Sequence, residues 1–129
     1  MTAHYKEKIP NMSYKQMDAR KLQFEDGSFD CVFDKACFDS VLSGDNSTPN
    51  SRDMLSEIHR VLAPNGVYIC VTYGVPASRL NYFDNKLFDW AGNVTVAKAA
   101  KPYVNTGAVI AEGDKNENEN FHFIYIMQK

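Results

Sequence analysis

Charged side chains follow two short apolar runs of the sequence and could take part in binding or catalysis. Asp18 closes the run YKQMD (14–18), and Asp34 and Lys35 follow the run FDCVF (29–33). A carboxylate at a strand end accepts hydrogen bonds from amino groups, and a lysine ammonium pairs with anionic oxygens. The three histidines are dispersed and the three cysteines form no C-x-x-C pair, so the sequence predicts no metal site. The expected chemistry is therefore hydrogen bonding and charge pairing at strand ends.

The elements that must position these side chains alternate between strands and helices. We expect strands at 14–18, 29–33, 67–72, 93–100 and 121–127, and helices at 49–62 and 77–85. Apolar residues of the first of these helices recur at three-and-four spacing, with Glu57 and Arg60 outside the stripe, so one face must be buried. The run 67–72 is nearly all apolar, as in a parallel strand covered on both faces. The pattern predicts an α/β layered sheet with helices on both faces that ends in an antiparallel strand pair.

The sequence also predicts the character of two further segments and of the three cysteines. The first eight residues have helical composition, and 103–120 is a polar stretch predicted to be a flexible loop. The three cysteines lie among apolar neighbours and are expected to be reduced and mostly buried.

Composition excludes several classes of protein. The chain has 129 residues with 14 Lys plus Arg against 16 Asp plus Glu, and this net charge of -2 argues against a nucleic-acid binder. No run approaches the roughly 18 to 20 apolar residues of a membrane span, and the first ten residues lack the apolar core of a signal peptide. We expect a globular, cytoplasmic protein with neither a membrane nor a nucleic acid as its partner.

Several motifs resemble those of one enzyme family. The run DARKLQFEDGSFDCV (18–32) resembles the central motif of class I S-adenosylmethionine-dependent methyltransferases, and EIHRVLAPNG (57–66) is similar to their later helix, turn and strand. FDKACFDSVL (33–42) resembles the acidic-Lys-Gly-Thr-Leu-Asp-Ala-Leu segment of methyltransferase-like 13 and the elongation factor 1A lysine methyltransferases, with Ala36 and Cys37 in place of Gly-Thr. The ending FHFIYIMQK (121–129) also resembles the closing strand of that group.

The resemblance implies a fold, a cofactor and a role for four residues. The fold is a Rossmann-like methyltransferase sheet with strand order 3-2-1-4-5-7-6, and the cofactor is S-adenosylmethionine, leaving S-adenosylhomocysteine as product. Asp18 would accept a hydrogen bond from the adenine amino group, and the Ala19 backbone N–H would donate to a ring nitrogen. Lys35 would contact the carboxylate or ribose oxygens of the cofactor. Asp34 would orient an incoming amine as a catalytic residue, or serve as a structural turn residue.

Two elements of this family are missing from the sequence. No glycine occurs in residues 1–26, so the glycine-rich cofactor loop is absent, and so is the acidic residue that binds the ribose. By unit length, roughly 50 residues with the first two strands are missing, which predicts a partial sheet with two exposed strand edges. We expect residues 1–129 to be the C-terminal portion of a single methyltransferase domain, as a fragment or truncated gene product, or a homo-oligomer in which another copy fills the gap by strand exchange. The isolated chain is expected to bind cofactor weakly or not at all and to be inactive.

The sequence leads to one main function and one alternative. The main prediction is a methyltransferase fragment acting on a protein lysine, with a translation elongation factor as the partner. The alternative is a noncatalytic methyltransferase-fold module for binding or dimerisation. The aromatic residues Phe38, Tyr73 and Tyr82 could line the mouth of the substrate site, or belong to the core.

Overall fold

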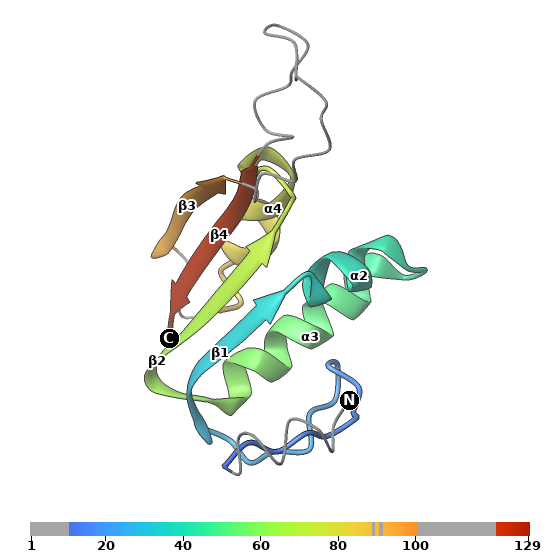
Figure 1. The fold of residues 1–129 in the computed structure, drawn as a ribbon, viewed down its shortest axis with the longest axis vertical. Coiled ribbons are helices and arrows are strands. Elements are labelled where there is room, and N and C mark those ends of the chain that lie inside the picture. The colour runs from blue at the N-terminus through green and yellow to red at the C-terminus, as the bar shows by residue number, and fades with distance from the viewer. Residues whose placement is uncertain (1–10, 89, 91, 101–120) are drawn as a thin grey trace, which may run out of the picture.

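The computed structural model describes residues 11–88, 90, 92–100 and 121–129 (Figure 1). Its elements are, in chain order, β1 (Phe29–Lys35), α2 (Cys37–Ser43), α3 (Ser47–Val61), β2 (Leu62–Thr72), α4 (Pro76–Phe83), β3 (Val94–Ala100) and β4 (Phe121–Gln128). The helix expected at the start of the chain and the loop expected at 103–120 lie outside the described residues, so both stay predictions.

The four strands form one mixed sheet in the order β1-β2-β4-β3. β1 and β2 are parallel, and β4 runs antiparallel to β2 on one side and to β3 on the other. The predicted antiparallel pair at one edge is therefore confirmed. The order also matches the last four positions, 4-5-7-6, of the strand order that the resemblance implied.

The strand predicted at 14–18 does not form. Residues 12–18 belong to no helix or strand, and the segment 11–28 runs as an irregular chain beside α3 before it enters β1 (Figure 1). A strand needs a hydrogen-bonding neighbour, and the outer edge of β1 pairs with no other strand among the described residues. The run YKQMD has strand-like composition, but the structure gives it no partner.

All three described helices cover the same face of the sheet, so the prediction of helices on both faces is wrong for this part of the chain. Register places Tyr68, Cys70 and Thr72 of β2 beside Met127, Tyr125 and Phe123 of β4, and all six are buried. They share one core with Phe38 of α2, Met54, Leu55 and Ile58 of α3, and Phe83 of α4.

The opposite face of the sheet, which we call the open face, carries apolar side chains without a covering layer in the described structure. It includes Phe33, Ile69, Val71, Ile124 and Ile126, which register places side by side. Phe33 is 65% exposed, and the four β-branched residues are half-buried. The nearly unbroken apolar run in β2 thus reflects one buried face and one half-covered face.

Residues 64–66 form a bulge at the start of β2. Phe29 pairs with Leu62 and Cys31 with Val67, so three extra residues bulge out of β2. Asn65 takes a left-handed conformation with φ 66, and a Cβ atom on Gly66 would lie 2.8 Å from the Ala63 carbonyl oxygen. Glycine is thus required at the point where α3 passes into the sheet.

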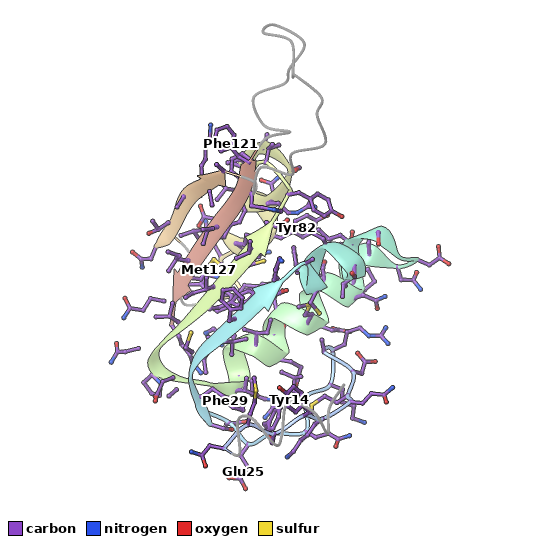
Figure 2. All side chains as sticks on the ribbon, viewed as in Figure 1. Tyr14, Glu25, Phe29, Tyr82, Phe121 and Met127 are labelled. Carbon is purple, nitrogen blue, oxygen red and sulfur yellow. The ribbon has the colours of Figure 1, made fainter. Side chains whose placement is uncertain are left out.

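Side chains from distant parts of the chain hold the helices in place. Trp90 is fully buried and donates its Nε1–H to the Phe83 carbonyl at 2.8 Å. The Lys129 Nζ donates to the carbonyls of His59 and Leu62 at 2.8 and 2.7 Å, which places a positive charge at the carboxyl end of α3. Figure 2 shows Glu25 and Phe29 at the end of the molecule where the 11–28 segment leads into β1.

Candidate active site

A hollow of about 370 Å³ lies between β1, α3 and the 11–28 segment, and we call it the β1 hollow. Its lining residues are Ala19, Leu22, Val32, Phe33, Asp34, Lys35, Cys37, Met54 and Ile58. Ala19, Asp34 and Lys35 are three of the four site residues chosen from the sequence, and Asp18 adjoins them in the chain. The structure therefore brings together two segments that the sequence separates by fifteen positions.

Asp18 is held in place by its neighbour Arg20. Its two carboxylate oxygens accept hydrogen bonds from the Arg20 backbone N–H at 2.9 Å, from Nε at 3.0 and 3.2 Å, and from Nη2 at 2.6 Å. These bonds lower the pKa of Asp18 to about 2. The side chain is still 49% exposed, so the carboxylate is ionised and accessible. It can accept one more hydrogen bond, such as one from an amino group.

Asp34 lies at the carboxyl end of β1 and is only 6% exposed. Its carboxylate accepts the backbone N–H groups of Cys37 at 2.8 Å and Phe38 at 3.1 Å, and the Tyr68 hydroxyl at 2.8 Å. It thereby caps the start of α2, where Ala36 has no side chain for that task. Burial raises the pKa of Asp34 above its ordinary value, against the opposing effect of these donors.

Lys35 follows on the opposite face of β1 and is exposed. Register places it opposite Val71, and the next residue, Ala36, donates its N–H to the Val71 carbonyl at 3.0 Å. Ala36 has φ 67, a left-handed conformation that glycine adopts without strain. This explains physically why a Gly suits that position in the motif that the segment resembles.

A second cluster of polar residues at the carboxyl ends of the strands was missed by the sequence analysis. Asp39 is 3% exposed, and its carboxylate pairs with Arg79 Nη2 at 3.0 Å and accepts the Thr72 hydroxyl. It also accepts the Tyr73 N–H at 3.4 Å, and the Gly74 N–H donates to the Thr72 hydroxyl at 3.0 Å. The only signal in the sequence was an acidic residue inside the apolar run CFDSVL (37–42).

The three aromatic residues that could line the substrate mouth differ in their burial. Phe38 is fully buried and its ring lies 5.7 Å from that of Tyr82, which is half-buried, so Phe38 belongs to the core. Tyr73 directly follows β2 and is 56% exposed at the carboxyl edge. All three cysteines are free thiols, as expected, but the expected burial is confirmed only for Cys70, because Cys31 and Cys37 are exposed.

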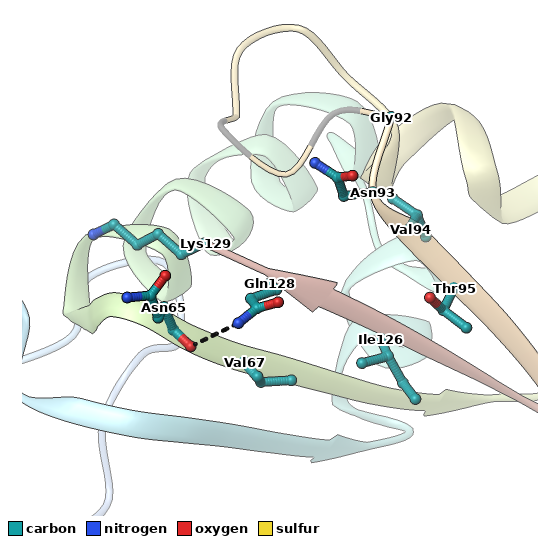
Figure 3. Close-up of a pocket in the computed structure, with 9 residues that line it drawn as sticks. All are labelled: Asn65, Val67, Gly92, Asn93, Val94, Thr95, Ile126, Gln128 and Lys129. Carbon is teal, nitrogen blue, oxygen red and sulfur yellow. Dashed lines mark hydrogen bonds between the residues drawn. The ribbon is translucent and has the colours of Figure 1, made fainter.

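A larger hollow, of about 820 Å³, lies at the opposite end of β2 (Figure 3). Its lining residues are Asn65, Val67, Gly92, Asn93, Val94, Thr95, Ile126, Gln128 and Lys129. The Gln128 amide donates to the Asn65 carbonyl at 3.4 Å, and the Lys129 ammonium is directed to the end of α3. Parallel sheets bind ligands at the carboxyl ends of their strands, so the smaller β1 hollow is the better candidate site.

Two other kinds of site are absent from the part of the chain that the structure describes. No group of three or more His, Cys, Asp or Glu side chains is placed to hold a metal ion there. Within those same residues, no helix combines the length and the apolar character needed to cross a bilayer.

Comparison with known proteins settles the family. Residues 1–70 match the family model described as a methyltransferase domain. The chain belongs to this methyltransferase family. Its sequence is 32% identical over 91 residues to EEF1A lysine methyltransferase 4 of Mus musculus, an alignment that covers 64% of this chain and 36% of that protein. It is 41% identical over 66 residues to the eEF1A lysine and N-terminal methyltransferase of Danio rerio, covering 51% of this chain and 9% of that protein.

The fold has a counterpart among solved structures. A protein of Thermus thermophilus, described as a candidate DNA modification methylase, superposes with a TM-score of 0.54 at 16% identity. The superposition covers 87% of this chain and 50% of that protein. The methyltransferase chain thus shares its fold with that protein, and it spans about a third of the mouse relative's length.

The β1 hollow fits part of the family's cofactor, S-adenosylmethionine. Leu22, Val32, Met54 and Ile58 offer apolar walls for a flat adenine ring, and Asp18 is an accessible acceptor at the segment that bounds them. Lys35 supplies a cation at the same hollow. The residues present therefore suit the adenine side and one anionic or hydroxyl group of the cofactor.

Proposed function

We propose that this chain forms the adenine-binding and acceptor-facing side of an S-adenosylmethionine-dependent methyltransferase that modifies a protein lysine. The observation that supports the proposal best is the meeting of Ala19, Asp34 and Lys35 in one hollow at the carboxyl end of β1. Membership of the methyltransferase family and similarity to two eEF1A lysine methyltransferases support it further.

Methyl transfer from a sulfonium is an in-line displacement, and when bound the cofactor supplies the activated methyl group. The protein mainly binds, orients and excludes water. Asp18 accepts a hydrogen bond from the adenine amino group and the Ala19 N–H donates to a ring nitrogen. The Lys35 ammonium pairs with a carboxylate or hydroxyl oxygen, and the apolar walls of the hollow keep water away.

A lysine acceptor must lose its proton before it can attack, because its free pKa is about 10.4. Burial of the arriving amine lowers that pKa, as for any desolvated ammonium. The anchored carboxylate of Asp34 lies at the rim where the amine would arrive and can orient it. Tyr73, exposed at the same edge, can contact the acceptor chain. We propose a translation elongation factor as this partner, and the cytoplasm, where it is found, as the location.

The function can be tested by methyl transfer to purified eEF1A from S-adenosylmethionine with a tritiated methyl group. The isolated chain is expected from its sequence to be inactive, but because the structure retains part of the cofactor site in the β1 hollow, we propose slow labelling of a lysine at stoichiometric protein, located by mass spectrometry. Asp18→Ala should abolish it and Asp30→Ala, an exposed control on β1, should not. The expectation of slow transfer reflects the partial fit of the hollow to the cofactor.

Two other results would contradict the proposal. Cofactor binding without label on eEF1A would exclude this lysine acceptor. Absence of both binding and label in a folded sample would favour the second candidate, a noncatalytic module for binding or dimerisation. The edge of β1 that is unpaired in the described structure and the apolar open face are the observations that favour that alternative.

A further inference from the structure

The segment that carries Asp18 and Ala19 has no secondary structure of its own to fix its position. Residues 11–28 lie outside every helix and strand, yet Ala19 and Leu22 form one wall of the β1 hollow. An irregular chain stays in place only where side chains or other backbone groups hold it. The contacts that hold this segment therefore determine the shape of the hollow.

Two residues of α3 supply most of these contacts. Arg60 donates from Nη1 to the Phe24 carbonyl at 2.8 Å and to Asp26 Oδ1 at 2.7 Å, and from Nη2 to the Leu22 carbonyl at 3.0 Å. Glu57 Oε2 accepts the Leu22 N–H at 2.9 Å. Both backbone groups of Leu22, the residue that lines the hollow, are thus bound by this pair.

Glu57 and Arg60 also bind one another. Their closest atoms, Arg60 Nη2 and Glu57 Oε2, lie 2.7 Å apart, and Nε donates to Oε1 at 3.2 Å. The pairing lowers the pKa of Glu57, so both side chains are charged at neutral pH. A guanidinium offers five N–H donors in a planar fork, and this arrangement uses three of its nitrogens. A lysine keeps the charge but cannot make these contacts together.

Two more bonds fix the segment on either side of Leu22. The Gly27 N–H donates to the Arg60 backbone carbonyl at 2.9 Å, and Arg20 Nη1 donates to Asn50 Oδ1 at 3.0 Å. Both partners lie on α3, whose position is set independently by buried Met54, Leu55, Ile58 and Val61. Thus α3 determines the position of the 11–28 segment, which forms one wall of the β1 hollow.

We propose that Glu57 and Arg60 are positioning residues of the methyltransferase site, which hold Ala19 and Leu22 at the depth that an adenine ring requires. Neither residue lines the hollow, so both act through the segment that they bind. The inference rests on the proposed function for the identity of the ligand. That Glu57 and Arg60 hold the 11–28 segment in place follows from their hydrogen bonds alone.

The test compares Arg60→Lys and Glu57→Ala with Arg52→Lys, a matched control at an exposed position of the same helix. Amide hydrogen exchange is measured in the free protein, and binding of S-adenosylhomocysteine and of 5′-methylthioadenosine is measured by NMR titration. We expect exchange at Leu22 and Gly27 to accelerate roughly tenfold in both variants while β2 and β4 stay unchanged, as expected for local opening. Affinity for the two ligands should fall by the same factor, because both carry the adenosine part.

The outcomes separate the inference from the proposed function. Unchanged exchange at Leu22 and Gly27, or faster exchange with unchanged affinity, would overturn the positioning role. A general loss of protection in Arg60→Lys would show a role in overall stability instead, and Glu57→Ala provides the independent check. If the wild-type chain binds neither ligand, the proposed function fails, and exchange alone then decides whether the pair holds the segment.

Discussion

Of the two roles that the sequence analysis left open for Asp34, the structure shows the structural turn role. Its carboxylate caps α2 by accepting the backbone N–H groups of Cys37 and Phe38, and it also accepts a hydrogen bond from the Tyr68 hydroxyl. Asp34 also lines the β1 hollow. The bound oxygens agree with the structural turn role, while the position keeps it at the rim where an acceptor would arrive. The catalytic assignment of Asp34 stays a prediction, as do the cofactor contacts assigned to Asp18, Ala19 and Lys35.

The pH dependence of stability tests the buried state of Asp34. Burial raises its pKa in the folded protein, so the folded state favours the protonated form, and the contribution of Asp34 is most favourable below the unfolded pKa of about 3.9. That contribution is lost as the pH rises through the folded pKa. Asn keeps a capping oxygen but does not titrate, so Asp34→Asn should gain stability relative to wild type in urea unfolding as the pH rises above about 4. A pH-independent difference would contradict this account.

At the scale of elements, the ion pair between buried Asp39 and partly buried Arg79 joins α2 to the start of α4 and, through Thr72, to the end of β2. Its position next to Tyr73 and Gly74 fixes the chain at the carboxyl edge of the sheet. A buried pair contributes little net stability as a whole, but removing one partner leaves an uncompensated charge.

Asp39→Ala is therefore expected to lower the free energy of unfolding by about 3 kcal/mol or more. Adding Arg79→Met in the same chain should recover part of that loss, because no unpaired buried charge remains. Chemical denaturation of the two single variants and the double variant measures this coupling, with the exposed Asp45→Ala as the control. Additive losses would show that the two side chains act independently.

The sequence predicted the helices and strands better than it predicted which faces of the sheet they cover. The apolar stripe of α3 and the aromatic, β-branched run of β4 carry enough local pattern to be read directly, and both are confirmed, although α3 begins at Ser47 rather than Pro49. The prediction of a strand at 14–18 was wrong because composition does not tell whether a neighbouring strand is present. Two sets of tertiary contacts could not be predicted, because no local pattern reveals them. One is the pairing of Asp39 with Arg79, forty positions away. The other is the binding of the Leu22 backbone by Glu57 and Arg60.

At the scale of the whole molecule, the open face and the edge of β1, unpaired among the described residues, are the largest departures from a self-contained domain. Exposed apolar sheet surface with an unpaired edge favours association with another chain. We expect the protein to self-associate as its concentration rises, as the sequence analysis anticipated for a sheet with exposed edges.

Phe33→Lys places a charge in the open face and should shift sedimentation toward the monomer. Leu87→Lys is the matched control, because Leu87 is 66% exposed against 65% for Phe33 but lies outside the sheet. A wild-type chain that is monomeric at all concentrations, or an equal effect of both substitutions, would contradict a role of this face in association.

The most direct test of the central claim is an NMR titration of the ¹⁵N-labelled chain with S-adenosylhomocysteine. Amide resonances can detect binding as weak as about 1 mM, which corresponds to about −4 kcal/mol. We expect shifts at Ala19, Leu22, Asp34 and Lys35 that disappear in Asp18→Ala and persist in Asp30→Ala. Shifts confined to the hollow around Asn65 and Thr95, or no shifts in a folded sample, would contradict the claim that the β1 hollow is the cofactor site.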